Sequence, residues 1–373
     1  MKEPIQQSKV SAFINRDTEL KFLLNWISKQ PESILFLFGP KSSGKTTLLN
    51  KFINEKINYN YYDIKYINLR KIFIANYKNF LHTFFEIDNS NPKKDIKKKR
   101  EYNLNVFKLT TEVLTALERN EVDPFVLMEN ELDRVSNKKK TPIIIIDELQ
   151  ILDGIYMNGQ KELIKELFNF FVSMTKESHL CHIMISSSDG YFIDRIYNDS
   201  KLTKTSEFLE IDYLPKKDIE YWLSHLKQES KIENLVLSRD QINMIWNYFG
   251  GSVWEINSFL SVLMDHAVEK KVTDEFIQEE AKKRIQTYKI RFQDYIGKHY
   301  DHDLFVAINR ILLQSSHFYQ KDLMKNFDRK KLKEELGILV QNNLFSYNPL
   351  SGQYKTQGKS ISLGLNKFCL EYH

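Results

Sequence analysis

The chain has 373 residues, of which 42% are hydrophobic and 13% aromatic, and this composition excludes an intrinsically disordered protein. Its length predicts about two or three domains. The net charge of +5 is a small excess, which permits nucleic-acid binding without requiring it. Two cysteines, Cys181 and Cys369, are too few for a zinc cluster or a disulfide framework, so we expect a reducing, cytoplasmic setting.

The sequence predicts neither a signal peptide nor a membrane-spanning segment. The first residues, MKEPIQQSK, are polar and lack the apolar stretch of a signal peptide. No run of about 18 apolar residues exists, so we expect no membrane-spanning segment and no membrane partner.

Residues 13–29 predict the first helix, with Asn15 or Asp17 as its N-cap and apolar residues at helical spacing after it. Arg16 lies at the start of this helix. It either approaches a nucleotide or is an ordinary solvated arginine.

Residues 34–50 form the central motif of the chain. Five apolar residues at 34–38 predict a buried strand, residues 39–46 match G-x-x-x-x-G-K-[ST], and a helical pattern follows at once. In this phosphate-binding loop, or P-loop, the glycines let backbone N–H groups point at an anion. We expect Lys45 to reach the β- and γ-phosphates and the Thr46 hydroxyl to bind Mg²⁺. The predicted nucleotide-binding residues are Gly39, Pro40, Lys41, Ser42, Ser43, Gly44, Lys45, Thr46 and Thr47.

An insertion is predicted after the second strand. Residues 60–69 alternate as a strand and are followed by helical sequence to about 87. A lysine-rich stretch then precedes two short amphipathic helices, at about 104–119 and 125–136, so that the insertion spans about 89–140. Its basic run, from Lys93 to Arg100, is either a nucleic-acid patch or a solvated loop.

The next strand, in the sequence TPIIIIDELQIL at 141–152, has four consecutive isoleucines, which is typical of a parallel strand buried on both faces. It ends at an acidic pair. Because ligands bind at the carboxyl ends of such strands, this pattern indicates a Walker B motif. Asp147 would bind Mg²⁺, and Glu148 would orient or deprotonate the attacking water.

Residues 161–176 predict a helix, and residues 179–188 predict a further strand that ends in serines. In P-loop ATPases with an additional strand, a polar side chain at this position contacts the γ-phosphate. Ser186 and Ser187 are the candidate catalytic residues here, the alternative being that they begin a loop.

A fifth strand is predicted at about Glu207 to Ile211, and Arg195, Lys201 and Lys204 precede it. Any of these cations could sense the γ-phosphate, in the same chain or in a neighbour.

From Pro215 the chain predicts four helices, with Gly250-Gly251 between two of them, as in a lid over a nucleotide. Residues 301–373 predict three helices and a hairpin with a Pro-Leu-Ser-Gly turn, which is a winged-helix pattern. Its third helix would carry four basic residues and two acidic ones, so DNA and a protein partner are equally compatible with it.

The motifs together resemble the archaeal ATPase family of the STAND branch of AAA+ P-loop ATPases. The resemblance covers roughly 11–290 and rests on FINRDTEL, GPKSSGKTT, IIIIDELQ, HIMISSS and YFGGSVWEINSFL. It implies an α/β fold with a parallel sheet flanked by helices, then an all-α lid and a winged helix. The implied domains are an ATPase core at 1–213, a lid at 214–299 and a winged helix at 300–373.

The resemblance also implies roles for single residues. Lys45 would contact phosphate, and Thr46 and Asp147 would contact magnesium. Glu148 would contact the attacking water. Two features depart from the family pattern. Lysines rather than an arginine precede the last core strand, and Ser252-Val253 rather than a proline follow the glycine pair. We therefore expect altered nucleotide sensing and slow turnover.

The resulting hypothesis is a cytoplasmic, Mg²⁺-dependent ATPase that acts as a nucleotide-driven switch. One alternative is an ATP-regulated DNA-binding protein resembling replication initiators. Another is a signalling or defence scaffold whose winged helix docks a protein and whose chain forms homo-oligomers.

Overall fold

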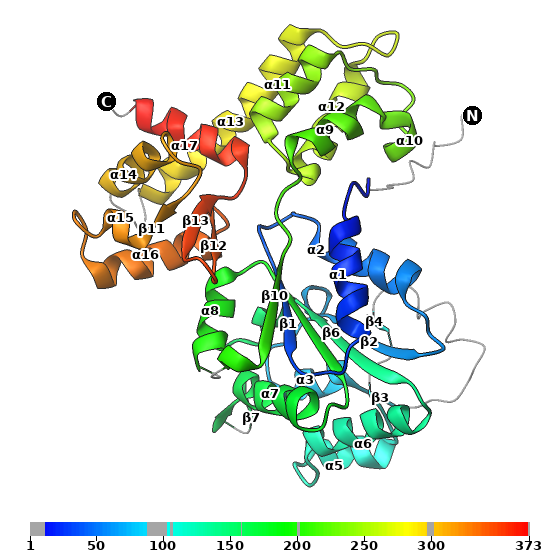
Figure 1. Ribbon diagram of the computed structural model, residues 1–373. Coiled ribbons are helices and arrows are strands. Elements are labelled where there is room, and N and C mark those ends of the chain that lie inside the picture. Colours follow the sequence, from blue (N-terminus) through cyan, green and yellow to red (C-terminus); the bar gives the residue numbers. More distant parts are fainter. Residues whose placement is uncertain are drawn as a thin grey trace. The chain divides into compact units, whose positions relative to one another are not determined.

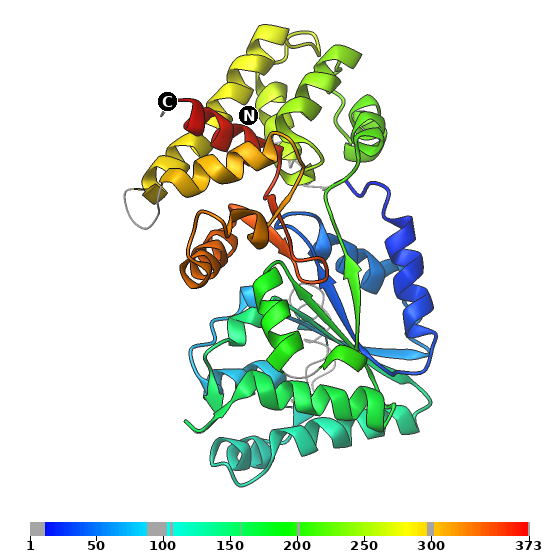
Figure 2. The ribbon, with the colours of Figure 1, turned by 60° about the vertical axis from the view of Figure 1, so that its left-hand side comes forward.

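The computed structural model describes residues 12–87, 103–104, 107–157, 159–199, 202–296 and 302–371 (Figures 1 and 2). The chain divides into two compact units. Unit 1 consists of residues 1–16, 40–44 and 212–373, and unit 2 of residues 17–39 and 45–211. In the described part of the chain, no helix is both long and apolar enough to cross a membrane.

Unit 2 contains a six-stranded sheet in the order β10-β1-β9-β6-β2-β4. Five strands are parallel, and β4 runs antiparallel to β2, so the predicted parallel α/β fold is confirmed. Strand β9 lies between β1 and β6, which is the position of the additional strand expected from the sequence. The six strands are β1 (Ile34–Phe38), β2 (Tyr62–Asn68), β4 (Asn103–Leu104), β6 (Thr141–Asp147), β9 (His182–Ser187) and β10 (Ser206–Glu210).

Helices cover both faces of this sheet. All five residues of β1 are buried, as are the isoleucines of β6, because apolar side chains on both sides of a parallel sheet need a covering layer. Helices α3 (Tyr77–Phe84), α7 (Leu163–Val172) and α8 (Gly190–Asp199) contribute to one core with Phe36 and Ile144. Helix α1 (Asp17–Ile27) lies on the other side of the sheet in both views (Figures 1 and 2).

The insertion differs from the prediction at residues 107–109. Strand β5 (Phe107–Leu109) pairs in parallel with β3 (Phe85–Ile87), so the prediction of a helix from about 104 was wrong. The reason is that Phe107 is buried against Phe85 and the helix begins only after the Thr110 cap. Unit 2 also contains α5 (Thr111–Glu118), α6 (Pro124–Asn137), β7 (Tyr156–Met157) and β8 (Lys161–Glu162). The basic run at 93–100 lies outside the described residues.

Unit 1 is mainly helical. The predicted lid region contains α9 (Lys216–Ser224), α10 (Leu226–Ser230), α11 (Arg239–Phe249), α12 (Val253–His266) and α13 (Asp274–Ile296). The predicted winged-helix region contains α14 (His302–Leu312), β11 (Phe318–Tyr319), α15 (Gln320–Leu323), α16 (Arg329–Gln341), β12 (Phe345–Asn348) and β13 (Gln353–Thr356). Its strands form an antiparallel sheet in the order β11-β13-β12, and β12 and β13 are the two strands of the predicted hairpin.

The last helix, α17 (Lys359–Glu371), was not predicted from the sequence. It lies against α13, and an ion pair joins Lys289 to Glu371. Gly364 explains the close approach of the two helices, because a Cβ atom at this position would lie 2.6 Å from the Tyr288 Cβ.

Buried His182 predicts acid sensitivity. It is the first residue of β9, and its ring centroid lies 4.8 Å from that of Trp26. Burial lowers its pKa to about 4, although hydrogen bonds with backbone groups of Ile27 and Lys29 act to raise it. The unfolded chain therefore takes up the proton first as pH falls below the ordinary histidine pKa. We expect the free energy of unfolding to fall between about pH 6.5 and 4, by at most about 1.4 kcal/mol per pH unit from this group.

Urea unfolding at several pH values measures this effect. The His182→Leu variant should lose this part of the pH dependence, whereas His266→Leu, at an exposed site on α12, should keep it. Equal pH dependence in wild type and His182→Leu would contradict the prediction.

Gly39, at the end of β1, predicts a steric effect. Its φ is +150°, and a Cβ atom there would lie 2.1 Å from the carbonyl oxygen of Ile211. The Ile211 backbone is held in place because its N–H donates to the carbonyl of Phe38. We expect Gly39→Ala to destabilise the protein by about 3 kcal/mol or more, because a backbone atom must move. Gly154→Ala is the control, since φ is +73° there and nothing lies within 4 Å of its Cβ position. Similar thermal unfolding of the two variants would show that Gly39 does not restrict packing.

Candidate functional site

The P-loop follows β1 and leads into α2 (Lys45–Lys51), which continues as a π-helix at Phe52–Lys56. Three of its residues have positive φ, namely Gly39 (+150°), Ser42 (+63°) and Gly44 (+98°). The Ser43 N–H donates to the Pro40 carbonyl at 3.2 Å, which closes the turn. When residues with positive and negative φ alternate, their backbone N–H groups point toward one side of the loop, as in anion-binding loops.

Lys45 is buried at the first position of α2. Its Nζ donates to the Gly39 carbonyl at 2.9 Å. Burial lowers its pKa to about 8, although the neighbouring Glu148 and Asp147 act to raise it. A lysine in this environment gains from an additional negative group, because an anion offsets the loss of hydration of its ammonium.

Thr46 and Asp147 are 101 residues apart in the sequence and meet in unit 2. The Thr46 hydroxyl donates to Asp147 Oδ2 at 2.7 Å, and the Asn68 amide donates to the same oxygen at 3.3 Å. The other carboxylate oxygen of Asp147 is buried and has no hydrogen-bond partner among the described residues. A hydroxyl beside a carboxylate with an uncompensated oxygen fits Mg²⁺, which prefers oxygen ligands and retains several waters.

Glu148 directly follows β6 and adopts a left-handed backbone conformation with φ +65°. Its N–H donates to the Ser186 carbonyl at 2.8 Å. Its carboxylate accepts from two side chains, with Arg70 bonded to Oε1 and Gln150 to Oε2. The Glu148 side chain is 7% exposed and that of Arg70 56% exposed, so a nearly buried carboxylate is paired with a cation that reaches solvent.

The two serines at the end of β9 have different surroundings. Ser186 pairs with Asp147 in the β6–β9 register, and its buried hydroxyl has no partner among the described residues. The Ser187 hydroxyl donates to Gln150 Oε1 at 2.9 Å and accepts from the Asp189 N–H at 3.0 Å. Ser186 therefore has a free hydroxyl near Asp147, whereas Ser187 supports Gln150.

Within unit 1, side chains from distant parts of the sequence bind P-loop residues 40–44. Arg16 donates to the carbonyls of Ser43 at 3.0 Å and Asp212 at 2.6 Å. The Tyr213 hydroxyl donates to the Lys41 carbonyl at 2.9 Å, and Gln357 accepts from the Lys41 N–H at 2.8 Å.

The other candidate sensor cations are placed differently. Arg195 forms an ion pair with Asp153 at 2.7 Å, and Lys204 is exposed in a short 3-10 turn. Lys201 lies outside the described residues. Arg16 thus contacts the P-loop directly, through the carbonyl of Ser43.

Sequence reasoning missed Asn68, Arg70, Gln150 and Gln357. Asn68 ends β2 and pairs with Asp147 in the parallel register, so the rule that identified Asp147 could also have identified Asn68. Gln150 lies two residues beyond Glu148. Gln357 follows the hairpin, and no local pattern in the sequence links it to the P-loop.

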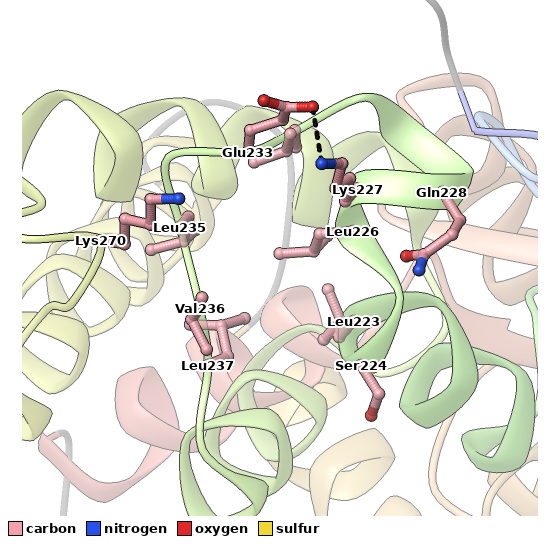
Figure 3. A pocket seen from close by; sticks show the side chains of 11 residues that line it. Leu223, Ser224, Leu226, Lys227, Gln228, Glu233, Leu235, Val236, Leu237 and Lys270 are labelled. Atoms are coloured by element: carbon pink, nitrogen blue, oxygen red, sulfur yellow. Dashed lines mark ion pairs between the residues drawn. The ribbon is translucent and has the colours of Figure 1, made fainter.

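A separate small hollow of about 230 Å³ lies in unit 1, around α10 and the segment that follows it (Figure 3). Leucines 223, 226, 235 and 237 line it, and an ion pair between Lys227 and Glu233 lies at its edge. It contains none of the predicted site residues.

Several proteins with similar sequences are named as ATP-binding proteins. An uncharacterized ATP-binding protein of Methanocaldococcus jannaschii is 32% identical over 348 residues, which cover 92% of this chain and 95% of that protein. Another from Pyrococcus abyssi is 29% identical over 365 residues, or 95% of this chain and 98% of the relative.

A solved structure has the same fold. The Walker-type ATPase paby2304 of Pyrococcus abyssi superposes with a TM-score of 0.63 at 15% identity, over 95% of this chain and 96% of that one. Residues 13–259 match a family described as an ATPase domain predominantly from Archaea. Together with the P-loop and the Asp147-Glu148 pair, this match shows that the chain belongs to that archaeal ATPase family.

Proposed function

We propose that this protein binds ATP with Mg²⁺ and hydrolyses it. The main support is the 2.7 Å hydrogen bond between Thr46 and Asp147, which brings the P-loop and the Walker B motif into contact. Binding is supported by the buried Lys45 and by the names of the relatives. Thr46 and Asp147 would hold Mg²⁺, which when bound neutralises charge on the phosphate oxygens.

Hydrolysis would require a water beside Glu148. The water oxygen would bond to the γ-phosphorus while the bond from that phosphorus to the β–γ bridging oxygen breaks. Glu148 would orient the water and accept its proton, and ADP and inorganic phosphate would leave. The buried Ser186 hydroxyl would donate toward the γ-phosphate or the water, and Lys45 would stabilise the charge on the phosphates.

The same proposal includes a switch. Arg16, Tyr213 and Gln357 bind P-loop residues 40–44 within unit 1, and Tyr213 and Gln357 do so through Lys41. A phosphate that reorders this loop would change these hydrogen bonds. We propose that nucleotide state thereby acts on a lid at 214–299 and a winged helix at 300–373, the two modules expected from the sequence.

Two substitutions test binding and hydrolysis separately. Lys45→Ala should weaken ATP binding by about 10- to 100-fold, because a charged partner of the phosphates is lost. Lys51→Ala, on the same helix in a surface pair with Glu55, is the matched control and should bind normally. Calorimetry with ATP and Mg²⁺ measures both. Unchanged affinity in Lys45→Ala would show that this site is not where ATP binds.

Glu148→Gln preserves the size of the side chain and removes its ability to accept a proton. We expect ATP binding to remain and phosphate release to fall by about 100-fold or more. Single-turnover phosphate release is the measurement, and wild-type turnover in this variant would exclude Glu148 as the base.

A second candidate function is DNA binding through the winged helix. It is favoured by four exposed basic residues at the start of α16, namely Arg329, Lys330, Lys331 and Lys333. Their charge is reduced by a 3.6 Å contact between Lys331 and Glu335 and by the Asp328 cap, which accepts from the N–H groups of residues 330 and 331.

Salt dependence tests this candidate. The slope of log affinity for duplex DNA against log salt concentration should decrease in magnitude by roughly 2 in the double variant Lys330→Ser/Lys333→Ser. The reason is that each lost phosphate contact lowers the magnitude of this slope by about 0.9. Lys282→Ser, at an exposed site on α13, should leave the slope unchanged. Absence of duplex binding at low salt would exclude the candidate.

A further inference from the structure

Gln150 connects the end of β6 to the end of β9. Its Nε2 donates to Glu148 Oε2, and its Oε1 accepts from the Ser187 hydroxyl at 2.9 Å. The Ser187 oxygen in turn accepts from the Asp189 N–H at 3.0 Å. The backbone after β9 is thereby linked to the carboxylate of Glu148 through two side chains.

Only one orientation of the Gln150 amide satisfies this series of hydrogen bonds. An ionised carboxylate only accepts, so the amide nitrogen of Gln150, not its oxygen, must face Glu148. The amide oxygen then faces Ser187, whose hydroxyl proton is available because the Asp189 N–H uses only its oxygen as acceptor. Rotating the amide by half a turn would place its oxygen against the Glu148 carboxylate, where neither group can donate.

The backbone holds Gln150 in place. Residues 149–152 form a 3-10 turn, and the Ile151 N–H donates to the Glu148 carbonyl at 3.1 Å. Leu149 and Leu152, the ends of this turn, are fully buried in the core of unit 2. The half-buried Gln150 therefore projects from a turn that is anchored on both sides.

The two oxygens of Glu148 have unequal partners. Arg70 binds Oε1 through a long side chain that is 56% exposed, and such a side chain can move away into solvent. Gln150 binds Oε2 from the anchored turn and is itself bonded to Ser187. Departure of Arg70 would thus free one oxygen while Gln150 continues to hold the other.

We propose that Gln150 is a positioning residue for ATP hydrolysis. Its amide holds Glu148 Oε2, so that Oε1 is presented to the attacking water, and Ser187 fixes the orientation of that amide. This inference rests on the proposed function, because it requires Glu148 to act on the water. Gln150 itself transfers no proton and contacts no phosphate in this role.

The experiment measures ATP affinity, KM and kcat in the full-length protein. In Gln150→Leu we expect kcat to fall by about 10- to 100-fold, as for loss of a hydrogen bond to a charged group. KM and ATP affinity should change by less than about threefold, because binding in the ground state is unaffected. Gln160→Leu, at an exposed glutamine ten residues further on, is the matched control and should resemble wild type.

Two further variants keep the test informative if the leucine disturbs folding. Gln150→Glu has nearly the same shape but cannot donate to Glu148 when ionised, so its kcat should fall at least as far as that of Gln150→Leu. Ser187→Ala should lower kcat by a smaller factor, roughly three- to tenfold, since it removes one neutral hydrogen bond. Combining Ser187→Ala with Gln150→Leu should lower kcat no further than Gln150→Leu alone, because both act through one contact.

The Glu148→Gln background separates the inference from the proposed function. If Glu148→Gln is inactive and Gln150→Leu retains wild-type kcat, only the role of Gln150 is overturned. The role of Gln150 is also overturned if Gln150→Leu raises KM without lowering kcat. It is overturned too if Gln150→Leu lowers kcat by the same factor in the Glu148→Gln variant as in the wild type. Wild-type turnover in Glu148→Gln, or a wild-type protein that binds ATP without hydrolysing it, overturns both proposals.

Discussion

The parallel register of the central sheet is the constraint on which the candidate site depends. Asn68, Asp147 and Ser186 occupy the same level on β2, β6 and β9 because each pairs with its neighbour in register. Parallel strands end at one edge, so three polar residues that follow three apolar runs come together there. A shift of one residue in any of these strands would turn its polar residue to the opposite face of the sheet.

The site also shows how burial and charge act together. Lys45, Asp147 and Glu148 are all nearly buried, and each has a partner of suitable charge or polarity. One oxygen of Asp147 lacks such a partner among the residues that the structure describes. Buried charges are stable only when paired or bound to a metal. The uncompensated oxygen therefore marks the place where an additional cation would lower the free energy of the site.

Much of this arrangement was predictable from the sequence, since it depends on local patterns. The glycine loop, the isoleucine run before Asp147 and the serines that end the next strand each identify a strand end, and the fold class follows from their order. Gln357 and Tyr213 were not predictable, because their hydrogen bonds to Lys41 join residues 316 and 172 positions apart. Helix α17 was not predicted, and its Gly364, a poor helix former, is explained by the close contact with α13.

The left-handed backbone of Glu148 has a consequence for the choice of residue at this position. A glutamate with φ +65° is strained by about 1 kcal/mol relative to glycine, which adopts this conformation without steric conflict. Folding alone would thus favour glycine or asparagine at residue 148. The chain instead carries a carboxylate there and surrounds it with Arg70 and Gln150. Position 148 is therefore a place where the demands of stability and of chemistry oppose each other, and a sequence released from the chemical demand would be free to drift toward the more stable residue.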